Sequence, residues 1–200
     1  LPVIVVDDGS SDGTAEVARA AGAAAIEQVP NQGKGAALRT GFRRALEADG
    51  IEAILTLDGD GQHDPAEIPA FLAALALEPR PDLVIGRRNF RAMPPLRRLS
   101  NVLGGWAFSW AIGHEVPDNQ SGYRLVSRRL AEATLASDEP GFAFEVEQIT
   151  MCIRMGGTIA WVPIRTIYAG APSHIRPLAH LREFIRIVRQ ARRDVRMPLS

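Results

Sequence analysis

Two carboxylates one residue apart, Asp58 and Asp60, follow the apolar run at residues 51–57. Carboxylates at this spacing can both reach one hard cation, and Mg²⁺ or Mn²⁺ held in this way usually takes phosphate oxygens of a substrate as further ligands. A polar Asp-Gly turn without a metal is the competing interpretation. A calcium loop is excluded, because its sixth and twelfth positions would be His63 and Pro69 instead of glycine and glutamate.

Lys34 is the single lysine of the chain, which has 22 arginines, and it stands between Gly33 and Gly35. Glycines allow a ligand to approach the backbone closely, and a lysine ammonium is a point charge that suits phosphate. A surface turn is the alternative. Residues 31–35 do not form a P-loop, because the GxxxxGK[ST] pattern is missing.

Other polar groups also stand where apolar runs end. Asp7 and Asp8, followed by Gly9, could accept hydrogen bonds from a nucleoside, or they could simply cap a helix and form a turn. Arg88 follows a third apolar run, and Arg124 ends the polar segment 118–124. The guanidinium groups of these two arginines could bind a diphosphate or a phosphate acceptor.

Several other chemistries are excluded by missing patterns. The chain has no G-x-S-x-G elbow for a serine nucleophile and no G-x-G-x-x-G after its first apolar run. Its four histidines show no metal-ligand spacing with one another or with the single cysteine, and only His63 stands beside candidate site residues. We therefore expect neither a serine hydrolase nor a dinucleotide-dependent dehydrogenase.

The elements that must position these residues follow from the hydrophobic pattern. Continuous apolar runs at residues 1–6, 51–57 and 81–86 predict strands buried on both faces, and residues 157–164 predict a late strand. Helical patterns at residues 14–21, 65–77, 95–112 and 141–155 alternate with them. This order predicts an α/β domain with a largely parallel sheet, whose strand ends bring the polar clusters to one cleft.

The whole chain of 200 residues is 46% apolar and 23% charged, which is typical of one globular domain. A single cysteine excludes an internal disulfide. We expect no signal peptide and no membrane-spanning helix, because neither an n-region with a cleavage site nor a run of about 18 apolar residues occurs.

Charge is divided unevenly along the chain. Residues 1–150 carry 14 basic and 21 acidic side chains, whereas residues 151–200 carry 9 basic and 2 acidic ones. Residues 177–195 combine apolar positions at helical spacing with arginines on the other side, which predicts a basic amphipathic helix. The basic end of the chain favours an anionic partner such as a membrane surface or a nucleic acid, and a solvated helix face is the alternative.

Five motifs in order resemble glycosyltransferase family 2: residues 5–14, 31–35, 57–63, 85–88 and 118–124, the last with Tyr123 where the family has phenylalanine. The resemblance covers residues 3–177 and is strongest to the dolichol- or polyprenol-phosphate mannose synthase group. It implies a GT-A fold, with a Rossmann-like, mostly parallel sheet flanked by helices. Residues 1–177 would form this domain, and residues 178–200 would be its basic amphipathic C-terminal helix.

The resemblance also implies roles for the residues at matching positions. Asp7, Asp8 and Gly9 would lie at the nucleoside, with Lys34 near it. Asp58, Asp60 and Gln62 would hold Mg²⁺ or Mn²⁺.

On the acceptor side, Arg88 and Arg124 would neutralise the donor diphosphate or an acceptor phosphate. Glu145 and Glu147 would lie near the acceptor, and either could serve as the general base that a hydroxyl acceptor needs.

The implied activity is an inverting transfer of a sugar from a nucleotide-diphosphate-sugar to an acceptor. A polyprenyl phosphate is favoured over a hydroxyl acceptor, because the helix with Trp106 and Trp110 and the basic C-terminal helix could hold the protein at a membrane. We therefore expect a peripheral protein on the cytoplasmic, inner face of the membrane that binds no nucleic acid. The oligomeric state stays open.

The chain departs from the family at its start. Family members begin with a strand and helix that help to bind the nucleotide, and this sequence begins at what would be their second strand. We expect an unpaired strand edge and an incomplete nucleoside pocket. A catalytically impaired, nucleotide-binding or membrane-associated remnant is therefore the alternative function. A haloacid-dehalogenase-type phosphatase is disfavoured, because the lysine and the acid pair both precede Asp58.

Overall fold

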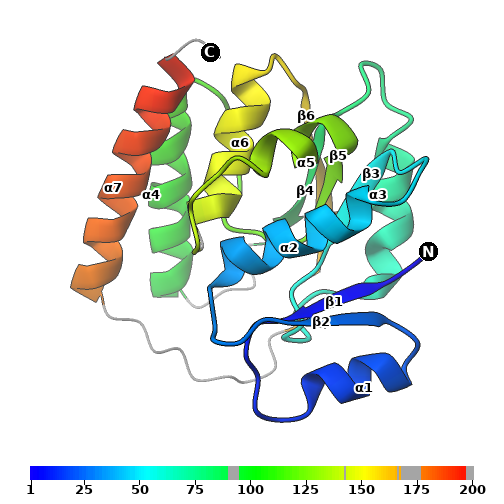
Figure 1. Ribbon diagram of the computed structural model, residues 1–200. Helices are drawn as coiled ribbons and strands as arrows, with labels where there is room; N and C mark the ends of the chain where they lie inside the picture. The colour runs from blue at the N-terminus through cyan, green and yellow to red at the C-terminus, as the bar shows by residue number, and fades with distance from the viewer. Residues whose placement is uncertain (90–94, 142, 166, 168–176, 197–200) are drawn as a thin grey trace.

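The computed structural model describes residues 1–89, 95–141, 143–165, 167 and 177–196, with side chains described outside 95–101, 177–184 and 196 (Figure 1). The strands form two sheets. In the first, β1 (Ile4–Asp7) pairs in parallel with β2 (Ala24–Glu27), and α1 (Thr14–Ala20) connects them.

The second sheet has four strands in the order β3 (Ala53–Thr56), β5 (Arg124–Ser127), β4 (Leu83–Arg88) and β6 (Ile159–Ile164). Strand β5 runs antiparallel to β3 and β4, while β4 and β6 are parallel. The predicted α/β domain is therefore confirmed, but its four-stranded sheet is mixed, while the two-stranded sheet is parallel. Strands β3, β4 and β6 all point the same way, so their carboxyl ends meet at one edge.

Between the two sheets, β1 and β3 each have one edge without a strand partner among the described residues. Helix α2 (Lys34–Leu46) spans the division, because it packs against β1 as well as against α5 (Arg128–Thr134) and α6 (Ala143–Arg154). The Lys34 end of α2 is thereby brought to α6.

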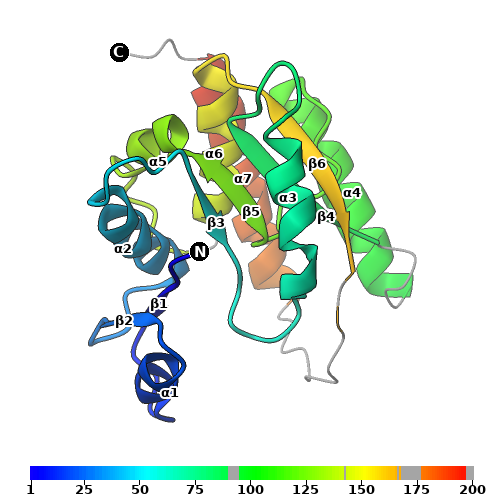
Figure 2. The same cartoon turned by 90° about the vertical axis from the view of Figure 1, so that its right-hand side faces the viewer.

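The core lies on both faces of β4. Leu83 and Ile85 face one side and Val84 the other, and all three are fully buried. On the first side they join residues of α2, α4 (Pro95–Ile112), α5, α6 and α7 (Pro177–Arg196). On the second side Val84 meets Phe71 of α3 (Ile68–Ala74), which follows the short helix η1 (Pro65–Glu67) (Figure 2).

Helix α7 packs against both α6 and α4, and its Ala191 is part of the core. The predicted amphipathic helix is therefore present and belongs to the same packed unit as the sheet. None of the helices in the described part of the chain is long and apolar enough to cross a bilayer.

Candidate functional site

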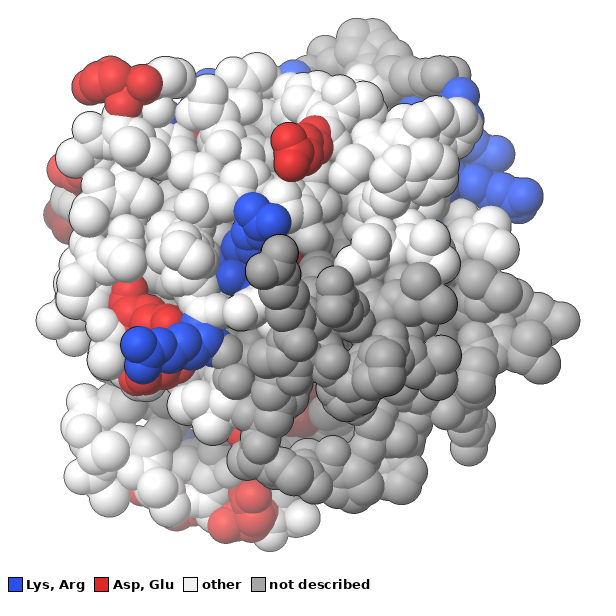
Figure 3. All heavy atoms as spheres, turned by 180° about the vertical axis from the view of Figure 1, so that it is seen from behind, with Lys and Arg blue, Asp and Glu red and all other residues white. Residues whose placement is uncertain are grey.

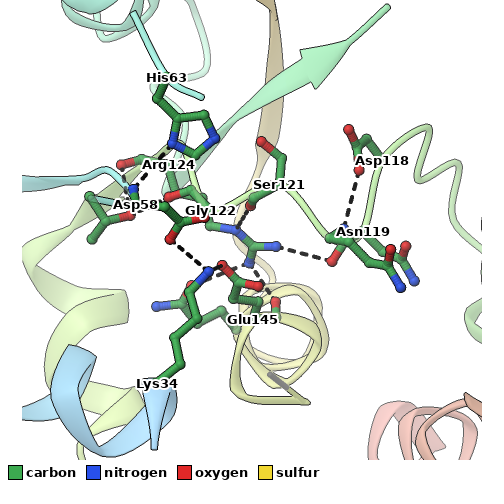
Figure 4. Close-up of polar contacts among 12 residues, drawn as sticks. Lys34, Asp58, His63, Asp118, Asn119, Ser121, Gly122, Arg124 and Glu145 are labelled. Atoms are coloured by element: carbon green, nitrogen blue, oxygen red, sulfur yellow. Dashed lines mark hydrogen bonds and ion pairs between the residues drawn. The ribbon is translucent and has the colours of Figure 1, made fainter. Parts of the chain in front are cut away.

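The candidate site lies where the end of β3, the start of α2, the start of α6 and the segment 118–124 meet (Figure 4). Lys34 is the first residue of α2, and its Nζ lies 2.7 Å from Oδ1 of Asp58 and 2.9 Å from Oε1 of Glu145. Burial alone would lower the pKa of the Lys34 ammonium, but the Glu145 and Asp58 carboxylates outweigh it and raise the pKa above its ordinary value. One ammonium therefore joins three elements and stays charged.

The glycines on either side of Lys34 lie close to backbone carbonyl groups of the loop before α6. A Cβ on Gly33 would lie 2.4 Å from the carbonyl oxygen of Pro140, and one on Gly35 would lie 2.4 Å from that of Glu139. The Gly35 N–H donates to the Pro140 oxygen at 2.7 Å. These glycines were expected to let a ligand approach the backbone. In the structure they instead let the start of α2 approach the loop before α6, which fixes α2 against α6.

The Asp58 carboxylate is placed by contacts on two sides. The backbone N–H of Asp58 donates to Nδ1 of His63 at 3.1 Å. On the other side, Gly122 lies so close that a Cβ on it would be only 2.5 Å from Oδ2 of Asp58. Burial lowers the pKa of His63, although Asp58 and Asp60 act in the opposite direction, so the ring is neutral and can accept this bond. The His63 ring also lies 5.1 Å from that of Tyr123. These contacts hold the Asp-Gly-Asp turn in shape.

Asp60 lies on the exposed part of the same turn. Its carboxylate accepts from the backbone N–H of Gln62 at 3.0 Å and from the Gln62 side-chain amide at 2.9 Å. Within the described part of the chain, no three His, Cys, Asp or Glu side chains gather as a ready-made metal cage. Mg²⁺ does not require one, because it is typically bound by one or two carboxylates together with substrate phosphates. The exposed Asp60 oxygens, with Asp58 beside them, fit such a cation.

Arg88, the last residue of β4, makes a two-pronged ion pair with Asp118. Its Nε and Nη2 donate to the two Asp118 carboxylate oxygens at 2.7 and 2.8 Å. The Asp118 side chain is 1% exposed, whereas that of Arg88 is 19% exposed. Asp118 therefore orients a guanidinium group that still reaches the surface near the strand ends.

Arg124 lies elsewhere than expected, because it is 1% exposed and its guanidinium faces the interior. It donates to the carbonyl oxygens of Ser121, Asn119 and Glu145, and to Oε1 of Gln148. In this position it ties the segment 118–124 to α6 and does not reach a phosphate at the surface. We assign it a positioning role in place of the expected contact with the ligand.

Glu145 and Glu147 do not share a site. Glu145 is 3% exposed and pairs with Lys34, whereas Glu147 accepts a hydrogen bond from the Ser137 hydroxyl. Glu147 lines a cavity between α6 and α7 together with Arg186 and Asp194, and burial raises the pKa of its carboxyl. Two residues along a helix means about 200° of rotation, which explains the separation.

The acids at the end of β1 accept hydrogen bonds from main-chain groups. The Asp7 carboxylate accepts from the backbone N–H of Ser10 at 2.8 Å. That of Asp8 accepts from the N–H groups of Gln32 and Gly33 at 2.8 and 2.7 Å. Gly9 has a φ of 85°, which suits glycine. This cluster fixes the loop leading to Lys34, and the predicted contact of Asp7, Asp8 and Gly9 with a nucleoside stays a prediction.

The sequence did not predict several residues that contact the site residues and hold them in position. Pro140 and Gln148 had no recognisable pattern. Gly122 lies within the segment 118–124, and its close approach to the Asp58 carboxylate explains why a side chain does not fit there. His63 was noted only for its position beside the carboxylates.

Comparisons with known proteins agree on one family. The chain matches the model of the family described as Glycosyl transferase family 2 over residues 1–134. An undecaprenyl-phosphate mannosyltransferase of Micrococcus luteus is 30% identical over 174 residues, which cover 81% of this chain and 70% of the relative. A dolichyl-phosphate hexose transferase of Haloferax volcanii is 33% identical over 164 residues, which cover 80% of this chain and 68% of the relative. Among such relatives, the share of the relative's length that this chain spans ranges from 40% to 74%.

The structure is also similar to glucosyl-3-phosphoglycerate synthase from Mycobacterium tuberculosis, solved in complex with Mn²⁺, UDP and glucosyl-3-phosphoglycerate. The two are 25% identical with a TM-score of 0.67, and the match covers 100% of this chain and 70% of the other. Together with the strand-end site, these findings show that the chain belongs to glycosyltransferase family 2 and has its GT-A fold.

Proposed function

We propose that this protein transfers a sugar, with inversion, from a nucleotide-diphosphate-sugar to a polyprenyl phosphate at the cytoplasmic face of a membrane. The observation that carries the proposal is the arrangement at the end of β3, where Lys34 neutralises Asp58 while Asp60 stays on the exposed part of the turn. Relatives named for sugar transfer to undecaprenyl and dolichyl phosphates support the acceptor class.

Mg²⁺ or Mn²⁺ would be held by Asp58 and Asp60, with Gln62 beside them, and would neutralise charge on the departing diphosphate. The residues of the chain position the reactants. Asp118 holds the Arg88 guanidinium in a fixed orientation near the strand ends, where it can attract an anionic group. Lys34 sets the direction of the Asp58 carboxylate.

In the proposed reaction, a phosphate oxygen of the acceptor attacks the anomeric carbon. The bond from that carbon to the diphosphate oxygen breaks, and the nucleoside diphosphate leaves with the electron pair. A phosphate acceptor is already ionised and needs no general base.

The positions of Glu145 and Glu147 support a phosphate acceptor over a hydroxyl acceptor. Glu145 is buried against Lys34, and Glu147 is turned toward α7, so neither stands ready to take a proton at the turn of Asp58 and Asp60. We therefore replace the expected base role of Glu145 with the positioning of Lys34.

The alternative is an impaired remnant, and one observation favours it: among the described residues, β1 and β2 form a sheet of their own and do not pair with the four-stranded sheet whose strand β3 leads to Asp58. Donor binding and turnover separate the two proposals. Purified protein would be titrated with nucleoside diphosphates in a calorimeter, with and without Mn²⁺, and then incubated with nucleotide-sugars and polyprenyl phosphate in detergent.

An active enzyme should bind a nucleoside diphosphate more tightly with Mn²⁺ and should form lipid-linked sugar. Both effects should be lost in Asp60→Ala and kept in Asp49→Ala, an exposed acid outside the site. Binding without turnover in folded protein would replace the transferase proposal with the remnant.

A further inference from the structure

Helix α4 presents an apolar side that nothing in the described structure covers. Val102, Leu103, Trp106 and Trp110 are 49%, 56%, 70% and 65% exposed. Their spacing of one, four and eight residues places them on one side of the helix. An exposed patch of this kind on a folded protein marks an interaction site.

Helix α7 lies alongside and supplies positive charge. The two helices run side by side, and the Arg192 guanidinium lies 4.9 Å from the centre of the Trp110 ring (Figure 1). Next to Arg192, on the same side of α7, are Ile185, which is 40% exposed, and the exposed Arg189 and Arg193. We call this combined surface of α4 and α7 the α4–α7 face.

The charge of the α4–α7 face is strongly one-sided. Among the side chains of α4 and α7 that the structure describes, four are arginines and one is an acid. This acid, Asp194, lines the cavity on the α6 side of α7. At the upper right-hand edge of Figure 3, on the side of α4 and α7, blue basic side chains stand beside uncharged ones.

We propose that the α4–α7 face docks on a bilayer that contains anionic phospholipids. Tryptophan prefers the interface between headgroups and acyl chains, and clustered arginines are attracted to an anionic leaflet. Apolar and basic side chains on one surface match both properties of such a bilayer. The proposal deepens the proposed function, because it supplies the surface on which a polyprenyl phosphate would reside.

The position of this face relative to the site fits that role. Strand β4 ends at Arg88, and the chain enters α4 at Pro95. Helix α6, which carries Glu145, packs directly against α7. A bilayer on the α4–α7 face would therefore be next to the elements that build the site.

Two other occupants fit less well. A two-fold dimer through this face would bring together two surfaces that both carry exposed arginines, which is unfavourable. A nucleic acid would match the arginines but would not bury Val102 and Leu103.

The test is sedimentation with vesicles, without donor or acceptor, so that its outcome does not depend on catalysis. Wild-type protein should bind vesicles of phosphatidylcholine mixed with phosphatidylglycerol and bind phosphatidylcholine alone at least about tenfold more weakly. Tryptophan fluorescence should shift to shorter wavelength upon binding.

The variants Trp106→Ser/Trp110→Ser and Arg189→Gln/Arg193→Gln should each weaken binding to the mixed vesicles by about tenfold or more. Val17→Ser and Arg43→Gln/Arg44→Gln, which change exposed residues on α1 and α2, should bind as wild type does. Circular dichroism would show that all variants are folded.

Equal binding by the α4–α7 variants and wild type would overturn the proposal. The proposal would also be overturned if the tryptophan variant bound vesicles as wild type does but had a different molecular mass in solution. The α4–α7 face would then be an interface between two copies of the chain. Sugar transfer in detergent without vesicle binding would overturn the docking surface alone. Vesicle binding without sugar transfer would leave the surface standing and contradict the proposed function.

Discussion

Nζ of Lys34 lies 2.7 Å from Oδ1 of Asp58, so the first residue of α2 neutralises the first acid of the Asp-Gly-Asp turn. The same ammonium reaches Glu145 of α6 at 2.9 Å. Because the two acids come from different elements, the ion pair determines the shape of the site as well as its charge. The following predictions depend on this arrangement.

Removing the ammonium should destabilise the fold. Lys34→Met removes the ammonium that pairs with the buried Glu145 carboxylate, and breaking such a pair costs about 3–5 kcal/mol in the free energy of unfolding. The measurement is urea unfolding at neutral pH. Adding Glu145→Gln to Lys34→Met should recover part of the loss. Full stability of Lys34→Met would show that the ion pair contributes little.

Two glycines of α2 offer a matched comparison. Gly35→Ala places a Cβ 2.4 Å from the Glu139 carbonyl oxygen and 2.9 Å from Cβ of Phe144, so backbone must move and stability should fall by about 1–3 kcal/mol. Gly41→Ala, in the same helix, meets only a Val6 methyl at 3.5 Å and should be neutral or stabilising by up to about 1 kcal/mol. Thermal unfolding of both variants would check this, and equal melting temperatures would contradict it.

A methyl group at position 122 should displace Asp58. A Cβ on Gly122 would lie 2.5 and 2.6 Å from the two Asp58 carboxylate oxygens, whereas one on Gly59 would meet nothing within 4 Å. Gly122→Ala should therefore lower the affinity for Mn²⁺ and nucleoside diphosphate by about tenfold or more, since ligands must be well oriented. The measurement is calorimetric titration. Gly59→Ala is the control for stability, and its unfolding should match wild type.

Stability should fall in mild acid because of His63. Burial lowers the pKa of His63 in the folded state, so the unfolded chain binds a proton more readily. The contribution is complete above the ordinary histidine pKa of about 6.5 and is lost as pH falls below that value toward the lowered pKa. Urea unfolding at several pH values between about 5 and 8 would measure this.

The free energy of unfolding plotted against pH has a slope to which His63 contributes. In His63→Gln this contribution should disappear, while the contributions of other groups remain. An unchanged slope in His63→Gln would show that another group causes the pH dependence.

Strands β1, β3 and β4 could be predicted because each is a continuous apolar run that ends in acids or arginines. Strand β5 could not, because it begins with Arg124, and an arginine is rarely buried. Its burial depends on carbonyl groups of the segment 118–124 and of α6, which come together only in the tertiary structure. Helix α2 was missed because Gly33 precedes it without a side-chain cap.

The sequence predicted which residues belong to the site better than it predicted the contacts among them. Lys34 and Asp58 were both identified, but their ion pair needs the packing of α2 on α6 through Gly35 and Pro140. The separation of Glu145 from Glu147 could have been foreseen from helical geometry alone. The predicted roles of these residues toward donor and acceptor remain proposals.

The central claim is sugar transfer to a lipid phosphate at the turn of Asp58 and Asp60. The most direct measurement follows label from a nucleotide-sugar into the organic phase, with polyprenyl phosphate or the neutral polyprenol as acceptor and Mn²⁺ present. We predict product with the phosphate only, and a loss of about 100-fold or more in Asp60→Ala. Equal transfer to polyprenol, or full activity of Asp60→Ala, would contradict the account.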